Sequence, residues 1–87
     1  MEWPEWWSWE LELTPHLLKR MEDRRFTEID LRTMLSRAGR IERDMVVGRW
    51  VIETRHHGRI WKVIVEPDYT LKVLVLVTGY PVEGRRK

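Results

Sequence analysis

The sequence contains no cysteine, which excludes a disulfide framework, a thiolate nucleophile and a zinc site built from thiolates. No apolar run approaches the roughly 20 residues that a membrane-spanning helix needs. The N-terminus is acidic and rich in tryptophan, whereas a secretory signal begins with basic residues and continues with aliphatic ones. We therefore expect a cytoplasmic protein without a membrane segment.

The chain is also short and carries little net charge. Its 87 residues suffice for one small domain, since a chain of this size buries about 60–65 % of the surface that it exposes when unfolded. There is one phenylalanine but there are six tryptophans, which we expect to fill much of the core. A net charge of +2 is compatible with a nucleic-acid ligand and does not require one. Arginine outnumbers lysine, and its guanidinium binds phosphate through two parallel hydrogen bonds.

The strongest secondary-structure signal lies between residues 50 and 78, where β-branched and aromatic residues form three runs separated by turn residues. The third run is apolar on both faces, which predicts an interior position in a sheet. The predicted strands are Trp50–His56, Arg59–Glu66 and Leu71–Thr78, joined by turns at His57-Gly58 and at Pro67–Thr70.

The first hairpin has a well-specified register. If His57-Gly58 is the turn, oppositely charged residues meet on one face and apolar residues meet on the other, and a slip by one residue destroys both patterns. The face that carries Trp50 and Trp61 is therefore expected to be core. The predicted pairs are His56–Arg59, Thr54–Trp61, Glu53–Lys62, Ile52–Val63, Trp50–Val65 and Arg49–Glu66.

In the second hairpin, a four-residue turn places Trp61 opposite Leu76 and Arg59 opposite Thr78. This register predicts that His56, Arg59 and Thr78 gather at one end of the core face. Polar groups gathered beside a core are candidates for a functional site.

The N-terminal segment allows two interpretations. Residues 1–6 read as an irregular, tryptophan-rich lead-in, because Pro4 disfavours a strand there. From Trp7 to Leu13 apolar and polar residues alternate, which predicts a half-buried strand. The alternative is a helical patch for a membrane surface or a protein partner, made of Trp3, Trp6 and Trp7.

Two helices follow. The pair Thr14-Pro15 predicts a helix that runs to about Arg25, with threonine as the N-cap and proline at the first helical position. Thr27 and Asp30 form a capping-box pattern that opens a second helix, which Gly39 is expected to end. The core stripe of the second helix is Leu31, Met34, Leu35 and Ala38.

Residues 40–47 read as a further strand, with Ile41 and Met45 facing the core and Val47 as a third candidate. The element order β-α-α-β-β-β-β predicts an α+β fold in which two N-terminal helices pack on an antiparallel sheet. We expect a single domain over residues 1–87, with the folded part at 7–82 and a basic tail at 83–87.

The block Leu13–Arg24, which reads LTPHLLKRMEDR, resembles the opening of the domain-of-unknown-function 4258 family. In that family, too, two helices lead into a four-stranded sheet, and its closing strand is similar to Val75–Pro81. The family is grouped with the barnase–EndoU–colicin–RelE superfamily of metal-independent ribonucleases, many of which are toxins. The resemblance covers about residues 10–82 and implies a RelE-like fold.

The resemblance also implies a site that cleaves RNA by attack of the 2′-OH. Histidine suits the proton transfers, arginine suits the phosphorane, and a hydroxyl donates one further hydrogen bond. No cofactor is implied. The predicted catalytic residues are His16, Arg20, His56, Arg59 and Thr78, and the predicted substrate-binding residues are Arg24 and Arg55.

Each of these residues also has a purely structural interpretation, as a helix-end residue, a turn residue or a member of a surface ion pair. A metal site made of His16, His56 and His57 is disfavoured, because no acidic residue has the spacing of a ligand. The resemblance implies RNA and a cognate antitoxin protein as partners. Two rival hypotheses use the tryptophan-rich N-terminus, either as a non-catalytic protein-binding module or as the contact of a structural dimer.

Overall fold

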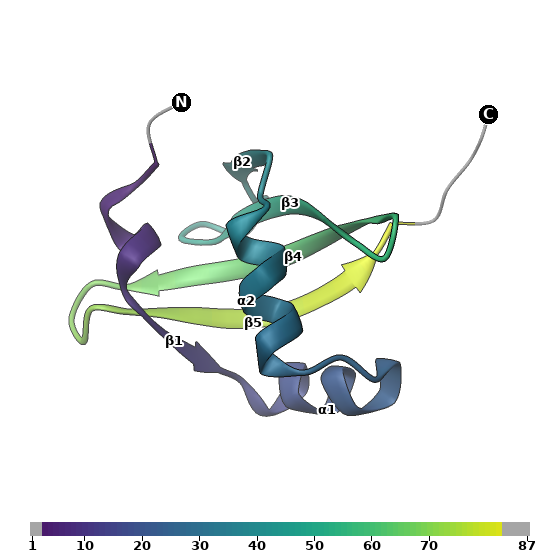
Figure 1. Cartoon of the computed structure of the whole chain (residues 1–87). Coiled ribbons are helices and arrows are strands. Elements are labelled where there is room, and N and C mark those ends of the chain that lie inside the picture. The colour runs from purple at the N-terminus through teal and green to yellow at the C-terminus, as the bar shows by residue number, and fades with distance from the viewer. Residues whose placement is uncertain (1–2, 83–87) are drawn as a thin grey trace.

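The structure is a computed structural model that describes residues 3–82 (Figure 1). Within this range it is an α+β fold with two α-helices and one five-stranded mixed sheet. The expected order β-α-α-β-β-β-β is confirmed, and the tail expected at 83–87 lies outside the described residues. Along the chain the elements are the 3₁₀ helix η1 (Glu5–Ser8), strand β1 (Glu10–Leu13), helices α1 (Pro15–Arg24) and α2 (Glu28–Ser36), and strands β2 (Arg40–Arg43), β3 (Trp50–His56), β4 (Arg59–Asp68) and β5 (Val73–Pro81).

The strand order in the sheet is β1-β5-β4-β3-β2, so β5 is interior, as its two apolar faces predict. β1 pairs with β5 in parallel, with Glu10 beside Val73 and Leu13 beside Leu76. The expectation of a wholly antiparallel sheet is therefore wrong at this edge. Parallel neighbours need a long crossover, and here the chain between β1 and β5, which includes both helices, supplies it.

The hairpin of β3 and β4 has the predicted register. Its pairing runs from Trp50 opposite Val65 to His56 opposite Arg59. Both residues of the His57-Gly58 turn have positive φ, 52° and 77°. This is the geometry of the two-residue turns that match the natural twist of a hairpin.

The hairpin of β4 and β5 differs from the prediction. β4 continues through Pro67 to Asp68, so the turn lies at residues 69–72 and not at 67–70. The Asp68 carboxylate accepts hydrogen bonds from two backbone N–H groups of this turn, both at 3.0 Å. Pro67 is tolerated in β4 because β3 does not extend that far, which leaves one side of β4 without a strand partner there.

A β-bulge in β5 changes the direction of its last residues. Leu76 pairs with Val65, but the neighbouring pair joins Ile64 to Thr78, which leaves Val77 as an extra residue. Thr78 consequently lies on the face of the sheet that points away from the helices. The predicted pairs Trp61–Leu76 and Arg59–Thr78 are both wrong.

Both helices begin at the predicted caps. At the start of α1, the Thr14 hydroxyl accepts from the Leu17 N–H (3.1 Å) and donates to the Val77 carbonyl (2.8 Å), which ties the helix to β5. At the start of α2, Thr27 and Asp30 each accept from the other's backbone N–H, at 3.1 and 2.9 Å. The predicted capping box is therefore confirmed.

The end of α2 and the strand after it differ from the prediction. α2 ends at Ser36, and Gly39 is not its cap, because the Gly39 N–H donates to the Glu53 carbonyl at 3.0 Å just before β2. β2 pairs with only the first four residues of β3. Met45 and Val47, which were expected near the core, are 98 % and 96 % exposed in the loop that follows.

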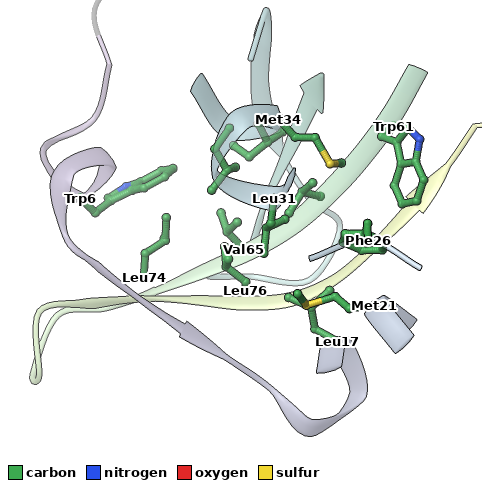
Figure 2. Close-up of a cluster of buried hydrophobic side chains, with 13 residues drawn as sticks. Trp6, Leu17, Met21, Phe26, Leu31, Met34, Trp61, Val65, Leu74 and Leu76 are labelled. Atoms are coloured by element: carbon green, nitrogen blue, oxygen red, sulfur yellow. The ribbon is translucent and has the colours of Figure 1, made fainter. Parts of the chain in front are cut away.

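The core lies between the helices and one face of the sheet (Figure 2). Its buried side chains come from η1, from both helices and from β3, β4 and β5. Trp6 is only 2 % exposed, and its ring lies 5.7 Å from the ring of Trp50. The segment expected to be an irregular lead-in thus contains a helical turn with a core residue, and β1 begins at Glu10 and not at Trp7. None of the helices within the described range is long and apolar enough to cross a bilayer.

Candidate functional site

The turn of the β3–β4 hairpin meets the connection between the two helices. His56, the last residue of β3, lies edge-on to Trp61, with ring centroids 5.6 Å apart and an interplanar angle of 87°. Its ring centroid is also 6.2 Å from that of Phe26, which follows α1 and packs against Trp61 at 5.1 Å. His56 is half-buried in consequence, while Phe26 and Trp61 belong to the core (Figure 2).

The position of His56 lowers its pKa below the ordinary value of 6.5. Burial of the imidazole is the largest cause, since it penalises the charged form. The neighbouring His57, whose ring centroid is 4.1 Å away, acts in the same direction, as does the charge of Arg37, while Asp30 opposes them. Burial therefore favours the neutral imidazole, whose lone pair can accept a proton.

Several exposed arginines lie on the segments next to this histidine, although Arg55, the residue before it in β3, points to the opposite face of the sheet. Arg59 is the partner of His56 across the hairpin, and Arg37 and Arg55 both line a small hollow of about 100 Å³ beside the same strands. Arg24 and Arg25 immediately precede Phe26. Among residues 3–82, none of these five arginines has a carboxylate within 4.0 Å. We call His56, His57 and these arginines, with Phe26 and Trp61 beneath them, the hairpin-tip site.

His16 is not part of the hairpin-tip site. It is exposed in the first turn of α1, whereas Phe26, the neighbour of His56, follows the last turn of that helix. The ten residues of α1 span roughly 15 Å. The prediction that the two histidines form one compact site is therefore wrong. Arg20 lies midway along α1, and Arg24 lies at the end near Phe26.

Thr78 is also separate from the site. It pairs with Ile64 on the sheet face opposite the helices, and its buried Oγ1 has no hydrogen-bond partner among the described residues. There are two physical causes. The turn at residues 69–72 shifts Thr78 along β4 away from Arg59, and the bulge at Val77 then turns its side chain to the other face.

Of the residues in the site, the sequence interpretation missed Arg25, Phe26, Arg37 and His57, and it placed Trp61 only in the core. The signal for Phe26 was present, since it is an isolated apolar residue in an otherwise polar connection between helices. Nothing in the sequence pattern placed Arg37, because its nearness to His56 depends on how α2 crosses the sheet.

Within residues 3–82 there is no group of three or more histidine, aspartate and glutamate side chains that could hold a metal ion. Compared with models of known families, with curated proteins and with solved structures, the chain matches none.

Proposed function

We propose that the hairpin-tip site binds RNA and cleaves it by acid–base catalysis, in the manner of the barnase–EndoU–colicin–RelE ribonucleases. The observation that carries this proposal is the half-buried His56, whose pKa is lowered by burial, beside arginines that no described carboxylate neutralises. A general base must be unprotonated at working pH, and His56 meets this condition.

The proposed reaction needs two proton transfers and a clamp for the phosphate. His56 removes the 2′-OH proton, the 2′-oxygen attacks the neighbouring phosphorus, and the bond to the 5′-oxygen breaks. His57, when protonated, supplies the proton to the leaving 5′-oxygen. The products are a 2′,3′-cyclic phosphate and a free 5′-hydroxyl. Arg59, which shares the sheet face of His56, is the candidate to hold the phosphate oxygens as their charge rises, whereas Arg55 lies on the opposite face.

A protein partner follows from the same surface. An acidic antitoxin that covers the exposed arginines would compete with RNA for them and would leave His56 inaccessible. We include such a partner in the proposal, because the exposed arginines of the hairpin-tip site favour a ligand of opposite charge.

The test is cleavage of a labelled, mixed-sequence single-stranded RNA by purified protein, with the all-DNA version of the same strand as a control. His56→Ala should slow cleavage by at least about 100-fold, since general base catalysis contributes on the order of 10²–10⁴. His16→Ala is the matched control and should cleave within about twofold of the wild-type rate, because it lies at the other end of α1. Rapid cleavage by His56→Ala, or loss of cleavage in His16→Ala alone, contradicts the proposed site.

A non-catalytic protein-binding domain is the second candidate function. One observation favours it: Trp3 is 38 % exposed and stacks on Trp7 with ring centroids 4.7 Å apart, which presents a flat aromatic surface. Trp6 is not available for such a contact, because it is buried in the core. Wild-type protein that leaves RNA intact in the assay above would favour this candidate.

A further inference from the structure

Exposed apolar side chains gather at the end of the molecule opposite the hairpin-tip site. Of the nine large hydrophobic residues that are exposed within residues 3–82, six lie in the segment just before η1, in the β2–β3 loop and in the β4–β5 turn, and three are scattered elsewhere. Figure 1 shows these three segments at the same end of the sheet. We call this surface the apolar end, and it consists of Trp3, Met45, Val46, Val47, Tyr69 and Leu71.

The β2–β3 loop holds its apolar residues outward in a defined shape. The Asp44 N–H donates to the Arg49 carbonyl at 3.0 Å, and the Arg49 N–H donates to the Val46 carbonyl at 3.1 Å. Gly48 supplies the positive φ of 91° that closes the loop. Because the loop is internally hydrogen-bonded, a contact made by Met45 and Val47 costs little ordering of the backbone.

A hollow lies next to this protruding loop. It has a volume of about 510 Å³ and is bounded by Val46 and Val47 of the loop, by Trp50 and Pro67 of the strands, and by Tyr69 of the β4–β5 turn. The apolar end therefore combines a projecting apolar tip with an adjacent recess whose walls are partly apolar or aromatic and partly charged, the charged residues being Arg43, Asp44, Arg49 and Glu66.

We propose that the apolar end binds a second copy of this chain. In this contact Met45 at the loop tip of each copy enters the hollow of the other, about a two-fold axis, so that the same surface is used twice. The arrangement removes from water side chains whose exposure has no structural role in the monomer.

The charges around the apolar end favour a second copy over a membrane or a nucleic acid. Both signs are present side by side: Arg43 precedes Asp44 at the loop, and Asp68 precedes the β4–β5 turn, of which Lys72 is the last residue. Arg49 is already paired with Glu66 at 3.0 Å. An anionic membrane or a polyanion would need a rim of one sign, whereas a two-fold contact can set each charge opposite its counterpart.

This contact is independent of the proposed ribonuclease activity. The two surfaces lie at opposite ends of β4, whose ten residues span roughly 30 Å. A dimer formed through the apolar end therefore leaves both hairpin-tip sites accessible.

The test is sedimentation equilibrium of the full chain from about 1 to 100 μM, a range in which a specific but modest contact is half-formed. The double variant Met45→Ser with Val47→Ser should weaken dimerisation by at least about tenfold, as should Tyr69→Ser from the opposite wall of the hollow. Ile29→Ser is the matched control, because Ile29 is 76 % exposed but lies on α2, and it should stay within about twofold of the wild type.

Two outcomes would overturn the inference: a wild-type chain that stays monomeric at about 100 μM, or a dimer that these variants leave intact. Monomeric protein that co-sediments with phosphatidylcholine vesicles, and does so only with Met45 and Val47 present, would assign the apolar end to a lipid surface instead. RNA cleavage measured on the same variants should match the wild type. If the wild-type chain does not cleave RNA, the ribonuclease proposal is refuted, but the proposed dimer contact is not affected.

Discussion

Replacement of Trp6 by alanine tests whether the N-terminal turn belongs to the folded core. The Trp6 side chain is 2 % exposed, and its ring lies 5.7 Å from Trp50 and 6.1 Å from Trp7. A buried tryptophan removes about 200 Å² from water, which at about 25 cal/mol per Å² is worth about 5 kcal/mol. A compact unfolded chain already hides part of this surface, so we expect a loss of about 3–4 kcal/mol in the free energy of unfolding. Small domains are stable by only about 5–15 kcal/mol in total, so the effect is large.

The measurement is urea unfolding followed by far-ultraviolet circular dichroism, which does not depend on tryptophan fluorescence. Trp3→Ala is the control, because Trp3 is 38 % exposed and should cost less than about 1 kcal/mol. If Trp6→Ala destabilises the protein no more than Trp3→Ala does, the core closes without the N-terminal turn. The burial argument for Trp6 would then be refuted.

Two further predictions concern His56 and Thr78. Because burial lowers the pKa of His56 from 6.5 in the folded protein, the unfolded chain binds that proton more tightly. The free energy of unfolding should therefore be highest above pH 6.5 and should fall as the pH drops below that value through the lowered pKa. His56→Gln should flatten this dependence in urea unfolding, and an unchanged slope would show that another group causes it. Thr78→Val replaces a buried hydroxyl that has no hydrogen-bond partner among the described residues. The free energy of unfolding should therefore rise by about 1 kcal/mol, and RNA cleavage should be unaltered. A marked loss of cleavage in this variant would return Thr78 to the site.

The β3–β4 hairpin shows what can be predicted when several signals agree. The His57-Gly58 turn accepts positive φ, the charges of Glu53 and Lys62 oppose each other, and the apolar residues share one face. Each alternative register loses at least one of these features, so the pairing is specified without tertiary information. The helix starts are local in the same sense, because a cap involves residues only three positions apart.

The prediction of the β4–β5 register was wrong because the hydrophobic pattern of β5 fits several registers equally well. β5 is apolar on both faces, so sliding it along β4 or inserting a bulge buries similar side chains in every register. Asp68 sets the position of the turn, because its carboxylate accepts hydrogen bonds from two backbone N–H groups of residues 69–72. Pro67 had suggested a turn that begins two residues earlier. The bulge at Val77 moved Thr78 to the opposite face, so the predicted site lost a member for a purely geometric reason.

In the candidate site, too, some residues could be placed from local pattern and others only from tertiary packing. His56 and Arg59 could be placed together from the sequence, because a two-residue turn leaves them as direct partners. His16 could not be placed, since its distance from them depends on where α1 ends against the sheet. His16 lies in the first turn of α1, whereas His56 of β3 packs against Phe26 beyond the end of that helix, and this separation is a tertiary fact that no local pattern contains.

Local chemistry thus determined the elements of this protein, their caps and one hairpin, because those features depend on neighbouring residues and on a single buried face. Tertiary packing alone decided the parallel edge strand, the bulge, the burial of Trp6 and the residues that contact His56. These depend on contacts between segments far apart in the chain, where many arrangements bury equal apolar surface and only the fit of whole elements distinguishes them.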